Sequence, residues 1–208
     1  MAWFMSVNIS YYNKNAVELA KQYNSLSFES VHNSWKQYWP EKGANVLDVG
    51  AGSGRDAQWF SKQGCLVVAA EPASALRQLA ISNSSEHILW IEDSLPDLAS
   101  VCELPHQYDL ILLSAVWMHL TTAQKVESMK PLSLLLTDKG KLVITLRHGS
   151  FSDGRETYGV SVDEIEKISR NLGLSVCHIV DGEDALMRAA VTWQTVILEN
   201  GEANNVGR

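Results

Sequence analysis

The residues with the clearest chemical signature lie between Val46 and Asp56, where an apolar run passes directly into three closely spaced glycines and then into a polar stretch. Glycines at such a junction allow a tight turn and let backbone N–H groups approach a ligand at the start of a helix. Their spacing is G-x-G-x-G, whereas dinucleotide-binding folds use G-x-G-x-x-G. Asp48 precedes the glycines. Its carboxylate would repel a pyrophosphate but would suit a ligand that carries an ammonium group.

The segment from Asp48 to Gly54, Asp-Val-Gly-Ala-Gly-Ser-Gly, resembles the glycine signature of the class I S-adenosylmethionine-dependent methyltransferases. The resemblance covers about residues 45–148 and implies that Asp48 and the loop backbone hold the methionine part of S-adenosylmethionine. The alternative is a glycine turn that serves packing alone. The cofactor-binding residues expected in and beside this loop are Asp48, Gly50, Ala51, Gly52, Gly54 and Arg55.

Glu71 ends the next apolar run, Leu66–Glu71, and Pro72 follows it. Glu71 comes about 20 residues after the glycine loop, near the separation at which an acidic residue meets a ribose in Rossmann-like folds. Its two oxygens can accept hydrogen bonds from both ribose hydroxyls. A glutamate at a strand end is often only solvated, but together with the glycine loop the ribose role is favoured. Pro72 is expected to line the same site.

Two further segments resemble cofactor-contacting parts of the family. The resemblance implies that Asp93 accepts a hydrogen bond from the adenine amine and that Ser94 follows the purine edge, although either residue could simply cap the next short helix. The run that ends at Ser114 and Ala115 is similar to the fourth strand of the family, whose end lies beside the sulfonium. His119 follows, either as a general base or as a cap for the helix beginning near Thr121.

The acceptor substrate is expected near the loop after residue 146, which carries Arg147, His148, Arg155 and Tyr158. Two arginines and a histidine in one loop of an acidic protein could pair with an anionic acceptor. The alternative is a set of solvated charges on an exposed loop, above all for Arg155. The candidate catalytic residues are His119, Arg147 and His148, with Arg155 and Tyr158 in the substrate site.

Nine of the 17 aromatic residues lie in the first 39 positions. Apolar residues recur there at three- and four-residue steps and predict helices over 10–24 and 28–38. The pattern resembles the lid of small-molecule members of the family, which implies that Tyr12 and Tyr23 reach the cofactor pocket. An aromatic ring near a sulfonium gains cation–π attraction and excludes water. The alternative is that these rings are core packing.

From residue 45 onward, short apolar runs alternate with helical stretches, which predicts a parallel sheet with crossover helices. The expected fold class is α/β, a Rossmann-like three-layer sandwich. Its seven-stranded, mostly parallel sheet would end in an antiparallel C-terminal hairpin. Within it, Pro131 is expected to break a helical stretch, and a turn is expected at Thr137–Gly140. The domain boundaries predicted are 1–40 for a helical aromatic lid, 41–199 for the methyltransferase domain and 200–208 for a polar tail.

Composition limits the function classes. The chain has 208 residues, 46% hydrophobic and 20% charged, and a formal net charge of −7, which disfavours nucleic acid as a partner. The three cysteines, without a Cys-x-x-Cys pair, indicate neither disulfides nor zinc and fit a reducing, cytoplasmic setting. No apolar run is long enough for a membrane span, and no signal peptide is expected at the N-terminus.

These observations predict an enzyme that transfers a methyl group from S-adenosylmethionine to an oxygen, nitrogen or sulfur atom of a small molecule, with S-adenosylhomocysteine as the product. Methyl transfer is an in-line displacement, so positioning the acceptor atom supplies most of the acceleration, and a base is needed only for a protonated acceptor. The alternatives are a methyltransferase that acts on protein or RNA and a non-catalytic protein that binds the cofactor for regulation. The oligomeric state cannot be read from the sequence.

Overall fold

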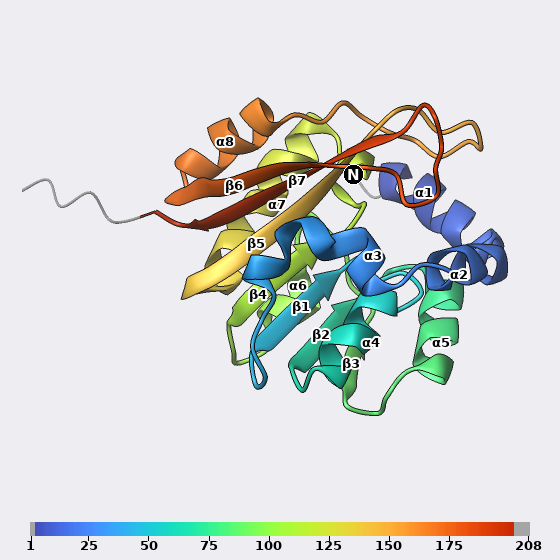
Figure 1. The fold of residues 1–208 in the computed structure, drawn as a ribbon, viewed down its shortest axis with the longest axis horizontal. Coiled ribbons are helices and arrows are strands. Elements are labelled where there is room, and N and C mark those ends of the chain that lie inside the picture. Colours follow the sequence, from blue (N-terminus) through green and yellow to red (C-terminus); the bar gives the residue numbers. More distant parts are fainter. Residues whose placement is uncertain (1–2, 202–208) are drawn as a thin grey trace, which may run out of the picture.

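A single seven-stranded sheet organises the molecule (Figure 1). The computed structural model describes residues 3–201, with side chains from residue 7 onward. The strand order is β3-β2-β1-β4-β5-β7-β6. The strands are β1 (Asn45–Val49), β2 (Leu66–Ala70), β3 (Ile88–Ile91), β4 (Tyr108–Leu113), β5 (Leu136–His148), β6 (Leu174–Gly182) and β7 (Thr192–Asn200).

The first five strands are parallel, whereas β7 is antiparallel to both of its neighbours, β5 and β6. The last strand of the chain therefore inserts between β5 and β6. This arrangement confirms the predicted α/β class with its antiparallel C-terminal strands. Residues 202–208 of the predicted tail lie outside the described residues.

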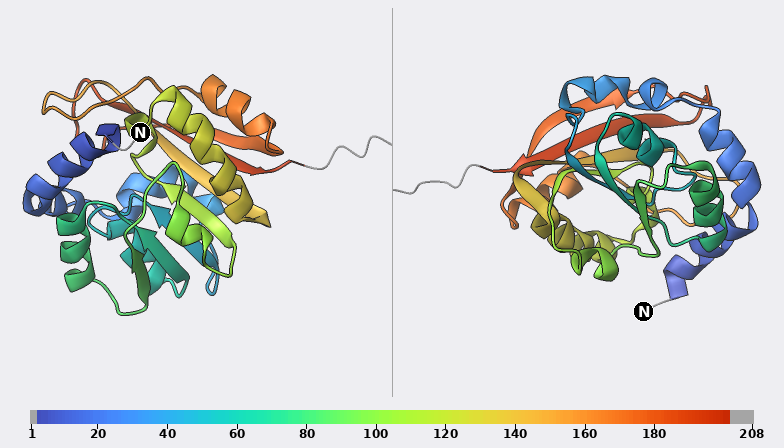
Figure 2. Two further views of the ribbon diagram at one scale, coloured as in Figure 1. Left: turned by 180° about the vertical axis from the view of Figure 1, so that it is seen from behind. Right: turned by 90° about the horizontal axis from the view of Figure 1, so that it is seen from below.

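Helices cover both faces of the sheet (Figures 1 and 2). One face buries Phe28, Trp35 and Phe60 against the strands, and the other buries Val101, Leu132 and Ile165. The first face carries α3 (Phe28–His32), the 3-10 helix η1 (Asn33–Tyr38) and α4 (Arg55–Lys62). The second carries α6 (Ala99–Cys102), α7 (Thr122–Leu135) and α8 (Val162–Arg170). Covered on both sides, the strands β1 and β4 are apolar and almost wholly buried, as their sequences predict.

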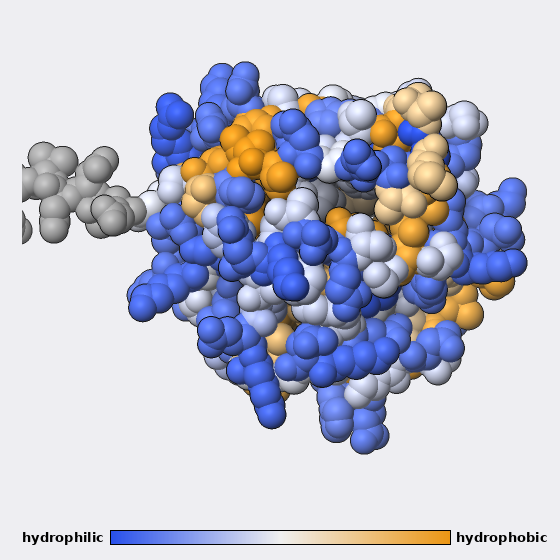
Figure 3. Space-filling model, viewed as in Figure 1, coloured by the Kyte–Doolittle hydropathy of each residue, from blue (hydrophilic) through white to orange (hydrophobic). Residues whose placement is uncertain are grey.

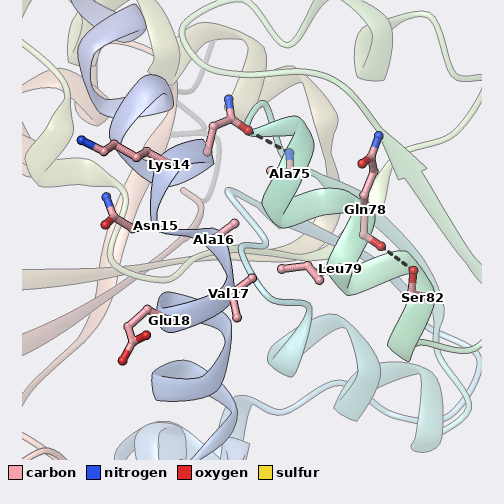
Figure 4. Close-up of a pocket in the computed structure, with 10 residues that line it drawn as sticks. Lys14, Asn15, Ala16, Val17, Glu18, Ala75, Gln78, Leu79 and Ser82 are labelled. Atoms are coloured by element: carbon pink, nitrogen blue, oxygen red, sulfur yellow. Dashed lines mark hydrogen bonds between the residues drawn. The ribbon is translucent and has the colours of Figure 1, made fainter.

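The N-terminal segment forms α1 (Trp3–Lys14) and α2 (Ala16–Asn24), which lie beside α5 (Ser74–Asn83) at one end of the sheet (Figure 1). The sequence predicted one helix from residue 10. The structure corrects this: the helix starts earlier and is interrupted at Asn15. The interruption lets Ala16 pack against Leu76 of α5. The outer groove between these helices is shown in Figure 4.

Two irregularities surround β5. The expected break at Pro131 is wrong, because α7 continues through it. Proline removes one backbone donor from a helix, but the neighbouring residues Met129 and Leu132 are completely buried and hold the helix on the sheet. The expected turn at 137–140 is present as a bulge in β5, since Leu136 pairs with Tyr108 and the next pairing is Lys141 with Leu110.

Candidate active site

A cavity of about 250 Å³ lies at the carboxyl ends of the central strands, where β1 and β4 are adjacent. In an open parallel sheet the chain leaves such a pair of strands in opposite directions, which creates a crevice for ligands. Helices α1 and α2 and the loops after β5 and β6 close it, and a space-filling view shows this part of the surface hollowed (Figure 3). The cavity is therefore walled by segments far apart in the sequence.

Most of the predicted site residues meet around this cavity. Those that line it are Tyr12, Tyr23, Asp48, Gly50, Ala51, Gly52, Arg55, Glu71, Pro72, Ser114, Ala115, His119, Arg147 and Arg155. Those that do not line it are Gly54, Asp93, Ser94, His148 and Tyr158.

The glycine loop passes closely under the segment that follows β4. Gly50 has a φ of +70°, in the left-handed region that favours glycine. A Cβ atom on Gly50 would lie 2.6 Å from Cγ2 of Val116. Its N–H donates to the carbonyl oxygen of Ala70 at 2.8 Å, which ties the loop to the end of β2. A side chain at position 50 would displace the loop, so the glycine is required for its shape.

Asp48 is the last polar side chain of β1 and is 1% exposed. Its Oδ2 atom has no hydrogen-bond partner within the described part of the chain. Burial raises the pKa of this carboxyl, and the nearby carboxylates of Asp56 and Glu71 raise it further. A buried oxygen without a partner is costly. It would be satisfied by a cationic donor in the cavity.

Asp56, on the first turn of α4, differs from Asp48 because cationic and N–H donors surround its carboxylate. Arg55 donates to it from Nε at 2.6 Å and from Nη2 at 2.8 Å, and Nε2 of His32 lies 3.1 Å from Oδ2. Burial opposes ionisation, but the Arg55 guanidinium and His32 hold the pKa of Asp56 well below its usual range. Since Trp35 donates to His32 Nδ1 at 3.2 Å, His32 Nε2 carries its proton toward Asp56. This contact ties α3 and η1 to the glycine loop.

Glu71 lies at the end of β2 and is 6% exposed. Its Oε2 accepts from the N–H of Gly52 and its Oε1 from the N–H of Ala73, both at 2.8 Å. Burial raises its pKa, although these two bonds oppose the shift. Each carboxylate oxygen retains a second lone pair that can accept from a ligand hydroxyl. Glu71 therefore both shapes the glycine loop and faces the cavity.

Asp93 serves the local backbone instead. Its Oδ1 accepts from the N–H of Ser94 at 2.8 Å, and its Oδ2 accepts from the N–H of Val101 in the first turn of α6 at 2.9 Å. This is the capping alternative that the sequence left open. Gly54 begins α4 with a φ of +79° and packs against Trp90.

The end of β4 is held in an unusual conformation. Ala115 has a φ of +59°, which is rare for a residue with a side chain and costs of the order of 1 kcal/mol. Its N–H donates to Oγ1 of Thr145, on the neighbouring strand β5, at 2.8 Å. The bond fixes Ser114 and Ala115 as walls of the cavity beside the glycine loop.

His119 ends the 3-10 helix η2 (Trp117–His119) and is joined to the N-terminal segment. Its Nδ1 lies 2.9 Å from the carbonyl oxygen of Glu156, which can only accept, so Nδ1 carries the proton. Its Nε2 therefore accepts from the hydroxyl of Tyr12, at 3.0 Å. Burial lowers the pKa of His119, and the charges of Arg155 and Arg147 lower it further. His119 is thus a neutral imidazole with a tyrosine hydroxyl on its free nitrogen.

Three arginines line the other part of the cavity. Arg147 ends β5, Arg155 follows in the loop, and Arg188 comes from the connection between β6 and β7. Of the remaining predicted residues in this loop, Tyr158 contributes its N–H to the carbonyl oxygen of Met118 at 2.8 Å. His148, the last residue of β5, is intermediate in exposure and lies outside the cavity lining.

Sequence reasoning missed several lining residues, among them Asn8, Thr145, Phe151 and Arg188. Asn8 bridges to the loop after β5: its Oδ1 accepts from the N–H of Glu156 at 2.9 Å, and its Nδ2 donates to the carbonyl oxygen at 3.1 Å. No local motif marks these residues, because each reaches the cavity through a tertiary contact. Only Arg188 could have been suspected from the sequence, because it is a charged residue in the polar connection before β7.

The comparisons agree with this geometry. A family model described as a methyltransferase domain matches residues 19–178. The chain belongs to the methyltransferase family. It is 26% identical over 125 residues to an uncharacterized methyltransferase of Bacillus licheniformis, a match that spans 60% of this chain and 56% of that relative. The chain thus covers a little over half the length of this relative.

Solved methyltransferase structures share the fold. A TehB-like S-adenosylmethionine-dependent methyltransferase of Corynebacterium glutamicum is 21% identical, with a TM-score of 0.65 over 92% of this chain and 97% of that one. The 1,6-didemethyltoxoflavin-N1-methyltransferase of Burkholderia thailandensis is 17% identical, with a TM-score of 0.69 over 96% of this chain and 89% of that one. The predicted membership of the methyltransferase family is therefore confirmed, and the fold is the one that these S-adenosylmethionine-dependent and small-molecule methyltransferases share.

No helix between residues 3 and 201 has the length and apolar character needed to cross a membrane. Over the same part of the chain, no group of three or more His, Cys, Asp or Glu side chains is arranged to hold a metal ion.

Proposed function

We propose that this methyltransferase binds S-adenosylmethionine in the cavity and transfers its methyl group to a small molecule held at the arginine-lined part. The observation that supports this most is the buried, unpartnered Oδ2 of Asp48 beside the glycine loop. It fits a ligand with an ammonium group, as the sequence pattern indicates. The limited volume and the closure of the cavity by α1 and α2 favour a small acceptor over a macromolecule.

The residues present fit the cofactor. Asp48 would bind the ammonium group, Glu71 the ribose hydroxyls, and the backbone of Gly50 and Gly52 would approach the methionine part. Ser114 and Ala115 would line the space near the sulfur. The proposed adenine contact of Asp93 and Ser94 would have to use lone pairs and backbone groups that the helix cap leaves free. S-adenosylmethionine supplies an electrophilic methyl group when bound.

Tyr12 and His119 form a route for a proton that leaves the acceptor. The Tyr12 hydroxyl donates to Nε2 of the neutral His119, so it can accept a hydrogen bond on its own oxygen. A proton passed to the Tyr12 oxygen would release the Tyr12 proton to His119 Nε2, and His119 would become cationic. Arg155, whose Nη1 lies 3.4 Å from the hydroxyl, favours negative charge on that oxygen. General base catalysis of this kind contributes about 10²–10⁴-fold.

The N-terminal helices exclude water and position the acceptor. Tyr12 and Tyr23 place their rings in the cavity wall, and burial raises the pKa of both hydroxyls, which keeps them neutral. Asn8 and Tyr12 link α1 to the loop after β5, on the opposite side of the cavity. Orienting the two reactants in a closed site is the main source of acceleration for a displacement at carbon.

The test is thermal unfolding with S-adenosylmethionine, S-adenosylhomocysteine and NAD in parallel, followed by a small-molecule screen for methylated products by mass spectrometry. A ligand at one hundred times its Kd adds about 2.7 kcal/mol, which raises the midpoint of a chain of this size by roughly 5–11 °C. We expect a shift with the two adenosyl ligands only. A shift with NAD alone would contradict the assignment of the loop, and methylation of protein or RNA alone would contradict the substrate class.

A further inference from the structure

We propose that the acceptor carries a compact oxyanion group, a carboxylate or a phosphate, which Arg147 binds with the help of Arg155 and Arg188. This inference rests on the proposed function, because it assigns the acceptor class of the same cavity. It identifies Arg147 as the residue that determines specificity for the acceptor.

Two of the three arginines, Arg147 and Arg155, are held against one aromatic ring. The Cζ atom of Arg147 lies 3.8 Å from the ring centroid of Phe151, and the Cζ atom of Arg155 lies 3.7 Å from it. Two guanidinium groups this close to one centroid cannot share a face, so the ring lies between them. Phe151 also stacks on His119, with centroids 5.8 Å apart. The ring therefore fixes both cations close to the Tyr12–His119 pair.

The counterions are unequally distributed among these arginines. Arg155 is paired with Asp153 through Nη2 at 2.6 Å, and Arg188 is paired with Asp184 through Nη2 at 2.6 Å. No acidic side chain of the described residues forms an ion pair with Arg147. Its Nη1 donates to the carbonyl oxygen of Gly149, and its Nε is buried without a hydrogen-bond partner among residues 3–201.

Arg147 is also the most enclosed of the three, with 6% of its surface exposed. A buried guanidinium without a counterion is costly. Burial lowers the pKa of Arg147, and the charges of Arg188 and Arg155 lower it further. The carboxylates of Asp184 and Asp153 oppose this shift in pKa. An oxyanion in the cavity would satisfy the free donors and compensate the charge, since a planar guanidinium matches a carboxylate or phosphate in two parallel hydrogen bonds.

The backbone brings the two arginine-bearing loops together. Gly149 has a φ of +97°, and a Cβ atom there would lie 2.2 Å from the carbonyl oxygen of Ala190. This close approach joins the loop after β5 to the connection that carries Arg188. Asp184 of that connection also accepts from Nε1 of Trp193, at 2.9 Å, so the position of Arg188 is fixed by β7. The cationic wall is therefore preorganised.

Arg147 and Arg155 lie at different distances from the Tyr12–His119 pair. This difference supports an acceptor whose anionic group binds Arg147 and whose nucleophilic atom lies near Tyr12. Arg155 contacts the Tyr12 hydroxyl, whereas Arg147 is on the other face of Phe151. An anion bound at Arg147 would leave the rest of the molecule free to extend toward Tyr12 and the cofactor part of the cavity.

The experiment measures binding to protein saturated with S-adenosylhomocysteine. The probes are small carboxylic acids and phosphate monoesters, each paired with a neutral counterpart, such as benzoate with benzamide and phenyl phosphate with phenol. Calorimetry would be run on the wild-type protein and on Arg147→Gln, Arg147→Lys and Arg188→Gln. Arg170→Gln, at an exposed position on α8, is the matched control.

We expect the anionic member of a pair to bind and the neutral member not to bind. Affinity should fall about ten- to a hundredfold in Arg147→Gln, recover in part in Arg147→Lys, fall less in Arg188→Gln and stay unchanged in Arg170→Gln. The tighter of the two anions identifies the headgroup.

Equal binding of neutral and anionic probes, or unchanged anion binding in Arg147→Gln that has retained its fold, would overturn the inference, as would the absence of anion binding altogether. S-adenosylhomocysteine is titrated separately. Its failure to bind the wild-type protein would refute the proposed function, whereas its binding without any anion effect would refute the acceptor class alone.

Discussion

Three carboxylates that line one cavity differ in how strongly their surroundings favour the ionised form. Asp56 faces Arg55 and His32 and is held ionised, whereas Asp48 has no such partner and burial favours its neutral form. Glu71 lies between these cases, with two backbone donors and strong burial. In the proposed complex, Asp48 would therefore face positive charge and Glu71 would face hydroxyl groups.

Glu71→Gln tests the ribose role. Gln retains one oxygen acceptor but carries no charge. One of the two N–H groups that donate to Glu71, those of Gly52 and Ala73, therefore loses its acceptor. We expect the affinity for S-adenosylhomocysteine to fall roughly ten- to a hundredfold, as for loss of a charge-assisted hydrogen bond of about 1.5–3 kcal/mol. Calorimetry measures this, with Glu127→Gln at an exposed position of α7 as control. An equal loss in both variants would contradict the assignment.

The lowered pKa of His119 predicts a dependence of stability on pH. Its pKa in the folded protein lies below the value of about 6.5 in the unfolded chain, so the unfolded chain takes up the proton first as the pH falls. The contribution of His119 to the free energy of unfolding is complete above about pH 6.5 and decreases below it.

Wild-type protein should therefore lose more of its Tm between pH 7.5 and 5.5 than His119→Gln does. His87→Gln, at an exposed position, should follow the wild type. Parallel losses in wild type and His119→Gln would show that His119 is not held neutral.

The place of a residue at the cavity could be predicted from the sequence where a local pattern carries it. Asp48 lies in the apolar run just before the three glycines and Glu71 ends the next run, and both line the cavity. Asn8 and Phe151 follow no such pattern, because their roles arise from contacts between α1, η2 and the loop after β5. Asp93 shows the opposite case, in which local backbone donors occupy a side chain that the family resemblance assigned to a ligand.

At the scale of elements, the alternation of strands and helices was predictable because strands β1 to β4 are short apolar runs between helical stretches. The failures occurred where tertiary packing overrides a local signal. Asn15 interrupts the first helix where α2 turns onto α5, and α7 continues through Pro131 because its neighbours are buried against the sheet.

Pro131→Ala should therefore stabilise the protein. Alanine restores a backbone donor within α7 and avoids the poor helix propensity of proline, which together amount to about 1–3 kcal/mol. The gain would be seen as a higher denaturant midpoint with an unchanged slope. Pro105→Ala, outside the helices, should give no such gain. A loss of stability in Pro131→Ala would mean that the proline ring contributes packing that outweighs the missing bond.

At the scale of the whole molecule, the cavity has an acidic part at the glycine loop and a cationic part at the loops after β5 and β6, within a chain of net charge −7. This polarity matches a cationic cofactor and an anionic acceptor. The volume of about 250 Å³ is below the range of about 300–1,000 Å³ that holds a drug-sized ligand. We therefore predict that helices α1 and α2 move outward when two ligands enter.

We predict that Asn13 controls this movement, because its side chain joins α1 to α5. Its Oδ1 accepts from the N–H of Ala75, in the first turn of α5, at 2.8 Å. Asn13→Ala removes this bond, worth about 1 kcal/mol, which should increase the dissociation rate of S-adenosylhomocysteine about fivefold. Stopped-flow fluorescence measures the rate.

Asn83→Ala, at the other end of α5, is the matched control, since Asn83 bonds only within its own helix, to the carbonyl oxygen of Leu79 at 2.7 Å. Because alanine has a higher helix propensity than asparagine, this variant should keep the stability of α5 and leave the rate unchanged. If the two variants released S-adenosylhomocysteine equally fast, the faster release would come from α5 itself. Helices α1 and α2 would then not control entry to the cavity. A faster release in Asn13→Ala alone would show that the contact between α1 and α5 limits how often the cavity opens.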